Sequence, residues 1–106
     1  MNQPLRQGDV FLIPVGSVPA GSTEVDREGG AVVLAWGEVT GHRHQIAGPA
    51  ATLLRTETDD RFLRIVGAPV DLVHEEHSTI EIAPGEYRVV IGREWSSDME
   101  SRQVVD

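Results

Sequence analysis

The sequence predicts an all-β protein, either one small β-barrel or a two-sheet sandwich of about eight short antiparallel strands. Two observations support this prediction. Eleven glycines and six prolines divide the 106 residues into short segments, and most of those segments are rich in β-branched and aromatic residues. Several segments also alternate apolar and polar residues with a period of two, which places successive side chains on opposite faces of a strand. We expect a single β domain over residues 1–106.

The expected strands follow one another closely along the chain. The first of them begins after Gln7-Gly8-Asp9, and a long polar loop at residues 17–30 follows it. The expected strands are residues 10–15, 31–36, 42–46, 51–56, 61–66, 70–74, 79–83 and 86–92. Trp36 continues the apolar face of its strand, so we expect it in the core. A short helical turn is expected after Ser97 or Asp98, both of residue types that commonly cap helices.

The segment Ala83-Pro84-Gly85-Glu86 is typical of a tight turn. Proline presets φ at its own position, and glycine accepts the positive φ that follows. We therefore expect this segment to close a hairpin between the strands at 79–83 and 86–92.

Composition excludes several classes of protein. The chain has no cysteine, which excludes disulfides, thiolate zinc sites, iron–sulfur clusters and cysteine nucleophiles. A net charge of -8 argues against non-specific binding of nucleic acid. No apolar run is long enough to span a membrane, and the first residues lack the pattern of a signal peptide, so we expect a cytoplasmic location. Exposed strand edges would allow a homodimer.

All four histidines lie in two short clusters, TGHRH at residues 40–44 and HEEH at residues 74–77. His42 and His44 are two apart, so in a strand both point to the same side. His74 and His77 are three apart and would point to opposite faces of a regular strand. They can face one site together only if the ladder breaks within residues 74–78, and we predict this break. Without it, His74 and Glu76 would point inward and His77 outward.

These clusters predict a metal site. In a chain without cysteine the ligands must be imidazole and carboxylate groups, which suit Zn²⁺, Fe²⁺, Mn²⁺ or Ni²⁺. The predicted ligands are His42, His44, His74 and His77. The candidate catalytic residues are Glu75 and Glu76, of which Glu76 is also a candidate fourth ligand, and Glu38 is a further candidate ligand. Such a site would serve a metal-dependent hydrolase, isomerase or oxygenase.

Two other functions are compatible with the same residues. The first is a non-enzymatic interaction module, in which the histidine clusters form a recognition or pH-sensing surface for a protein or RNA partner in a phage or defence-like assembly. The second is a metal-independent enzyme that uses histidine for acid–base chemistry. That chemistry needs fewer histidines than the two pairs present here.

The segments GEVTGHRH, HEEH and APGEYRVV resemble a family of short uncharacterised bacterial and phage proteins. Members share a TGHxH element, an HEEH element and a Pro-Gly-x-Tyr-x-Val segment. The resemblance covers nearly the whole chain and implies a shared site at the histidines, without naming a reaction. More loosely, the pattern GxxxxHxH is similar to the cupins, small β-barrels whose metal is held by three histidines and a glutamate. No acidic residue lies between Gln45 and Ala51, where the cupin glutamate would be expected.

Overall fold

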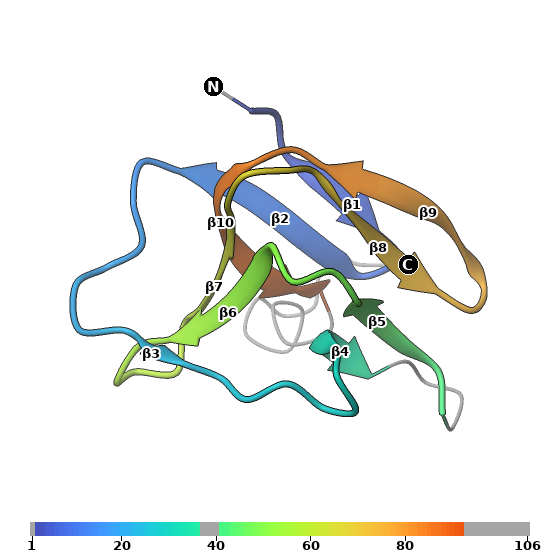
Figure 1. Cartoon of the computed structure of the whole chain (residues 1–106), viewed down its shortest axis with the longest axis horizontal. Helices are drawn as coiled ribbons and strands as arrows, with labels where there is room; N and C mark the ends of the chain where they lie inside the picture. Colours follow the sequence, from blue (N-terminus) through green and yellow to red (C-terminus); the bar gives the residue numbers. More distant parts are fainter. Residues whose placement is uncertain (1, 37–40, 93–106) are drawn as a thin grey trace.

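The computed structural model describes residues 2–36 and 41–92, and the regular elements of these ranges are ten antiparallel β-strands (Figure 1). This confirms the predicted all-β class. The strands are β1 (Leu5–Gln7), β2 (Val10–Val15), β3 (Thr23–Glu24), β4 (Val32–Trp36), β5 (Arg43–Ile46), β6 (Ala51–Arg55), β7 (Arg61–Ile65), β8 (Val70–His74), β9 (His77–Ile82) and β10 (Gly85–Ile91). The predictions for Glu38 and for a helical turn after Ser97 lie outside the described residues.

The strands form two open sheets, which corresponds to the sandwich alternative of the prediction. One sheet has six strands in the order β1-β2-β10-β7-β6-β3, and the other has four in the order β4-β5-β8-β9. Neighbouring strands within each sheet run antiparallel. No helix in residues 2–36 and 41–92 is both long enough and apolar enough to cross a membrane.

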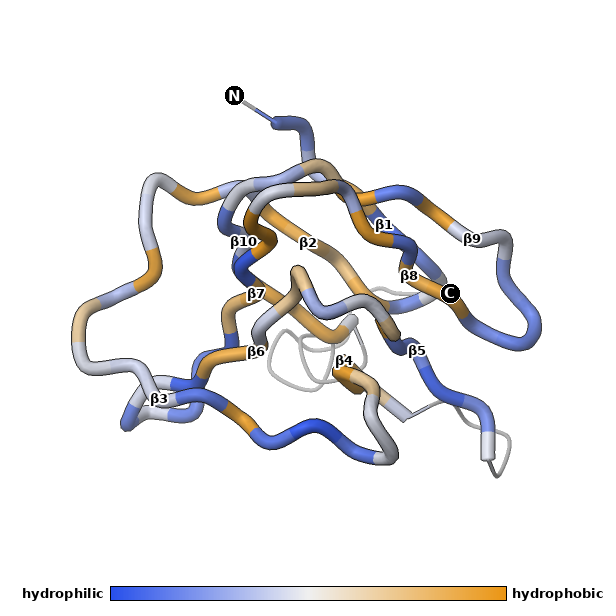
Figure 2. Tube along the Cα trace, in the orientation of Figure 1, coloured by the Kyte–Doolittle hydropathy of each residue, from blue (hydrophilic) through white to orange (hydrophobic). Residues whose placement is uncertain are grey.

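The core lies between the two sheets because the alternating apolar residues of both sheets point toward each other. Figure 2 shows apolar residues along β2, β7 and β10 and hydrophilic residues at the turn between β8 and β9. The fully buried side chains come from both sheets. The largest of them are Tyr87, Leu12, Leu34, Ile46, Leu63, Leu72 and Ile82. The hydrophilic turn between β8 and β9 lies at the edge of this core and carries two of the four histidines.

The predicted hairpin between the last two strands is wrong. β9 pairs with β8, whereas β10 pairs with β2 and β7, so the Pro84 segment carries the chain from one sheet to the other. The Tyr87 hydroxyl donates a 2.7 Å hydrogen bond to the carbonyl oxygen of Ala83 and thereby ties the two ends of this crossover together. The chain bends at Pro84, but β10 begins already at Gly85, so the predicted four-residue turn is reduced to this bend.

The core position predicted for Trp36 is also wrong, since its side chain is 48% exposed. The register between β4 and β5 shifts between Val33 and Ala35. This irregularity moves the alternation by one residue, and Ala35 instead of Trp36 points inward. The Arg43 guanidinium covers the indole, 5.4 Å from its ring centre.

Candidate metal centre

The HEEH segment forms a tight turn. β8 ends at His74, β9 begins at His77, and these two residues pair across the hairpin with Glu75 and Glu76 between them. The register also shifts between Leu72 and His74. The predicted break in the ladder is therefore confirmed, and the parity alternative that would turn His77 away from His74 does not occur. The two imidazole rings lie 4.6 Å apart between their centres.

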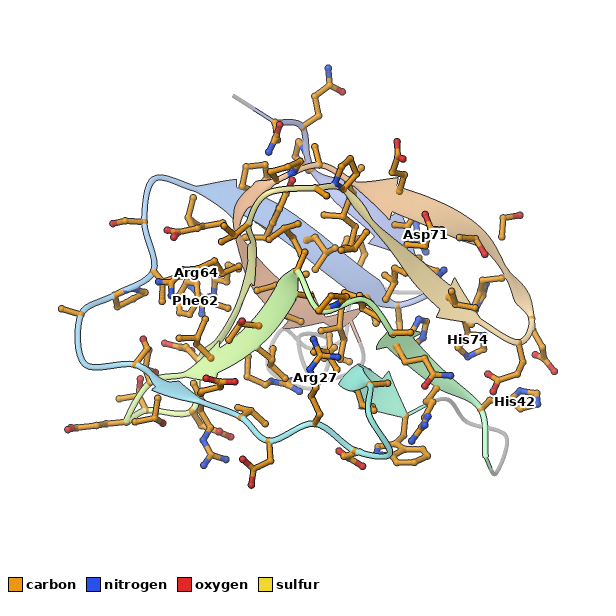
Figure 3. All side chains as sticks on the ribbon, in the orientation of Figure 1. Arg27, His42, Phe62, Arg64, Asp71 and His74 are labelled. Atoms are coloured by element: carbon orange, nitrogen blue, oxygen red, sulfur yellow. The ribbon has the colours of Figure 1, made fainter. Side chains whose placement is uncertain are left out.

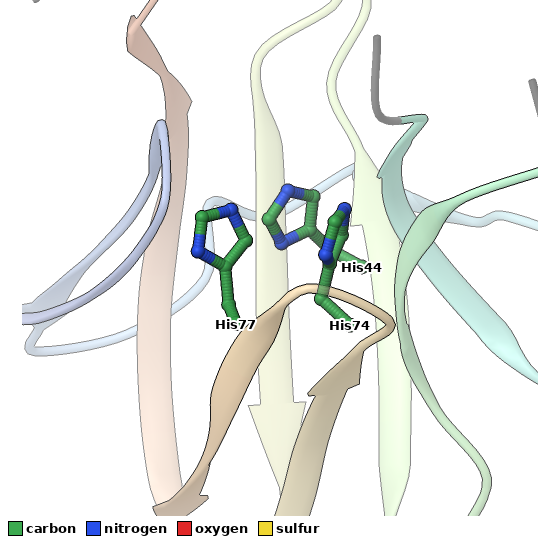
Figure 4. A group of neighbouring side chains, drawn as sticks. All are labelled: His44, His74 and His77. Carbon is green, nitrogen blue, oxygen red and sulfur yellow. The ribbon is translucent and has the colours of Figure 1, made fainter. Parts of the chain in front are cut away.

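The second histidine cluster reaches the same place because β5 pairs with β8 through Gln45 and Val73. This pairing sets His44 beside His74, with ring centres 4.3 Å apart. The rings of His44 and His77 are stacked at 5.7 Å. One ring nitrogen from each of the three residues lies within 4.8 Å of the others. Figure 4 shows these three rings gathered at the turn between β8 and β9.

The three rings differ in exposure. His44 is 2% exposed and His74 is 7% exposed, whereas His77 lies at the surface. Burial lowers the pKa of His74 below its usual value, and the nearby His77 lowers it further. His74 is therefore neutral at pH 7, which is the form that binds a metal ion.

His42 lies to one side of this triad. It precedes β5, and its ring meets His74 edge-on with centres 5.8 Å apart. In Figure 3, His42 and His74 lie near each other at the same end of the molecule. His42, His74 and Glu75 form a second group whose potential ligand atoms lie within 4.8 Å of one another. The predicted ligands thus divide into two overlapping groups that share His74.

The two glutamates of the HEEH turn both contact the TGHRH segment. Glu75 Oε1 accepts a 3.0 Å hydrogen bond from the backbone N–H of Arg43. This hydrogen bond lowers the pKa of Glu75, so its carboxylate is ionised at neutral pH. Glu76 Oε2 lies 3.5 Å from Nδ1 of His42. Glu75 is thus held by the backbone, whereas Glu76 is an exposed carboxylate beside an imidazole.

The turn between β1 and β2 also lines the site, which the sequence did not indicate. Gln7 pairs with Val10, so Gly8 and Asp9 form a two-residue turn, and the φ of +60° at Gly8 fits the first central position of a type II′ turn. A Cβ at Gly8 would lie 2.7 Å from Nε2 of His77 and 3.2 Å from Cε1 of His44. Asp9 Oδ1 lies 3.6 Å from Nε2 of His44. The sequence places these residues only at the start of the first expected strand, and their contact with residues far along the chain leaves no local signal.

Hydrogen bonds constrain two of the rings. Nδ1 of His44 lies 2.9 Å from Oε1 of Gln7, which is itself buried. Nδ1 of His74 accepts a 3.0 Å hydrogen bond from the backbone N–H of Glu76. A neutral His74 in this arrangement carries its proton on Nε2.

The spacing of His44, His74 and His77 would allow them to hold a metal ion. With Zn–N bonds of about 2.0–2.1 Å, tetrahedral geometry places ligand nitrogens about 3.3 Å apart. The three nitrogens lie within 4.8 Å of one another, so modest side-chain rotations of the three residues would close the site. Three imidazoles favour Zn²⁺, Fe²⁺ or Ni²⁺ over the hard cations that prefer oxygen ligands.

Comparison with known proteins gives a family but no activity. A family model described as "Domain of unknown function (DUF8820)" matches residues 6–92. This range includes all four histidines and the whole turn between β1 and β2. A search of curated proteins and a search of solved structures returned no match.

Proposed function

Because the chain belongs to this family of unknown function, we propose its role from the site itself: the protein binds one divalent transition metal ion through His44, His74 and His77. The observation that supports this proposal most strongly is the convergence of three imidazoles from β5 and the β8–β9 hairpin. Two of the three imidazoles, those of His44 and His74, are almost fully buried.

The triad is favoured over the group of His42, His74 and Glu75. It contains three imidazoles, the ligand type that transition metals prefer among the groups available here. It also contains both buried histidines, whose positions are held by the packed sheets. In the other group, the Glu75 carboxylate is already engaged by the backbone of Arg43.

Metal binding at His74 has a local consequence. Whichever ring nitrogen binds the ion, Nδ1 then either holds the metal or carries the ring proton. In both cases Nδ1 stops accepting the hydrogen bond from the Glu76 N–H. The proposal therefore includes a rearrangement of the turn at Glu76 when the ion binds.

Hydrolysis is the reaction class that this arrangement supports best. An ion held by three protein ligands keeps a coordination position open, and a bound divalent ion lowers the pKa of water so that it becomes a nucleophile at neutral pH. The carboxylates around the rings would accept the proton: Asp9 beside His44, and Glu76 beside His42. Glu75 would hold the TGHRH segment in place through its contact with Arg43.

Elemental analysis of protein purified without a histidine tag tests the proposal. After incubation with Zn²⁺ and removal of excess ion, we expect about one ion per chain in the wild type. His44→Ala, His74→Ala and His77→Ala should each lose it. His42→Ala is the matched control, since it removes an imidazole from the same end of the molecule but not from the triad.

Two results would contradict the proposal. A wild-type protein that holds no Zn²⁺, Fe²⁺, Mn²⁺ or Ni²⁺ would favour the interaction module instead. Loss of the ion in His42→Ala with retention in His77→Ala would assign the site to the other group. Thermal unfolding gives an independent readout, because an ion that binds only the native state must raise the melting temperature.

A further inference from the structure

We propose that Gln7 is a positioning residue that holds His44 in the tautomer whose Nε2 lone pair faces the metal. This inference deepens the proposed metal site and rests on it. It assigns a role to a residue at the end of β1, far from both histidine clusters in the sequence.

The orientation of the Gln7 amide is fixed by its surroundings. The side chain is 3% exposed, and its Nε2 donates hydrogen bonds to the carbonyl oxygens of Leu72, at 2.8 Å, and Ser78, at 3.0 Å. Both amide hydrogens are thereby used. If the amide were flipped, its oxygen would face the carbonyl oxygens of Leu72 and Ser78, and none of these three oxygens would receive a hydrogen bond from the other groups. Oε1 must therefore point at His44.

The fixed amide determines which ring nitrogen of His44 carries a proton. Oε1 of Gln7 can only accept, so Nδ1 of His44, 2.9 Å away, must carry a proton and donate it. In the neutral ring the lone pair then lies on Nε2. That nitrogen faces Asp9 Oδ1 at 3.6 Å. Metal-binding histidines in proteins are commonly oriented in this way by a partner at the other ring nitrogen.

The contacts of Gln7 also link the three strands that carry the triad. Its amide contacts His44 on β5, Leu72 on β8 and Ser78 on β9. Leu72 is two residues before His74, and Ser78 directly follows His77. One buried side chain thus hydrogen-bonds to one proposed ligand and to backbone carbonyls close in the chain to the other two.

The first test measures the tautomer and needs neither a metal nor a variant. Long-range ¹H–¹⁵N NMR of the metal-free protein at pH 8 distinguishes a protonated ring nitrogen from an unprotonated one. We expect His44 to be protonated at Nδ1 and unprotonated at Nε2. Protonation at Nε2, or rapid exchange between the two tautomers, would overturn the inference.

The second test measures zinc affinity in variants of Gln7. Gln7→Met keeps the approximate size of the side chain but removes the acceptor, and we expect Zn²⁺ to bind roughly 10–100-fold more weakly. Leu63→Ala, at a fully buried position on β7, outside the sheet that carries the three histidines, controls for lost stability and should leave the affinity unchanged.

The outcomes separate this inference from the proposed function. Zinc binding by Gln7→Met as tight as by the wild type would refute the positioning role and leave the metal site intact. An equal loss of affinity in Leu63→Ala would show that Gln7 acts only through stability. A wild type that binds no metal would refute the metal site, and the NMR measurement would still decide whether Gln7 fixes the tautomer of His44.

Discussion

The substitution Gly8→Ala tests whether the turn between β1 and β2 lines the metal centre. The added Cβ would lie 2.7 Å from Nε2 of His77, and an ordinary contact begins at 3.4 Å. The His77 ring must therefore move by about 0.7 Å, which exceeds the tolerance of about 0.5 Å for a functional constellation. We expect the zinc affinity to fall by about tenfold or more, since displaced ligands no longer reach a common ion.

The same substitution also strains the backbone. The control must therefore be a variant with similar backbone strain but no contact between the added Cβ and the histidines. Alanine is disfavoured at the φ of +60° found at Gly8, at a cost of about 1–3 kcal/mol in the free energy of unfolding. Gly67 has a φ of +90°, and a Cβ there would meet nothing within 4 Å. Gly67→Ala should lower stability by a similar amount and leave zinc binding unchanged.

Isothermal titration calorimetry with Zn²⁺ measures the affinity of both variants, and urea denaturation of the metal-free proteins measures their stability. The His77 ring is exposed and can rotate away, so the two variants should differ little in stability and clearly in affinity. Equal zinc affinity in Gly8→Ala and Gly67→Ala would refute the packing of the turn against the ligands.

Three further predictions concern other contacts. Hydrogen bonds from Arg64 and Val18 lower the pKa of Glu86 below its ordinary value of 4.5, so its contribution to stability is present above pH 4.5 and is lost as the pH falls below it. Glu86→Gln should be about 1 kcal/mol less stable at pH 7 and less sensitive to acid, as measured by urea denaturation across pH; an unchanged acid profile would contradict this. Leu72→Ala, at a fully buried position, should lower the free energy of unfolding by about 2–5 kcal/mol, whereas Val73→Ala on the exposed face should lower it by less than about 1 kcal/mol. Equal losses of stability in thermal unfolding would refute the assigned burial. The Glu76 amide should exchange with deuterium faster when Zn²⁺ is bound, because it loses its acceptor on His74, and an unchanged rate in the zinc-bound protein would exclude His74 as a ligand.

The strands that could be predicted are those long enough for their local sequence pattern to be visible. The eight expected strands correspond to β2 and to β4 through β10, because each is a short, mostly apolar segment bounded by glycine, proline or an acidic pair. β1 and β3 were missed: they have three and two residues, too few for a period of two to be visible. Their strand conformation depends on pairing with β2 and β6.

Failures arose where tertiary contacts decide the outcome. The hairpin predicted at Pro84 is a crossover, because the partners of β10 are the distant strands β2 and β7. The orientation of Trp36 was reversed by an irregularity in the pairing of β4 with β5. Neither feature is encoded in the few residues around it.

The candidate site was likewise predictable only where local sequence carries the signal. The two histidine clusters could be identified from the sequence because of their spacing, and the break at HEEH follows from the need to turn His77 toward His74. The roles of Gln7 and Asp9 could not be identified, since their contacts with His44 depend on how β1 and the turn after it pack against the sheet that carries the histidines. Only the folded chain brings that turn to the histidines.

The most direct test of the metal centre is a crystal structure of the protein grown with Zn²⁺, with anomalous diffraction recorded at the zinc absorption edge. We expect one strong peak about 2.0–2.1 Å from a ring nitrogen of each of His44, His74 and His77. A peak coordinated by His42 and Glu75 instead, or three rings that remain apart with no zinc between them, would contradict the account.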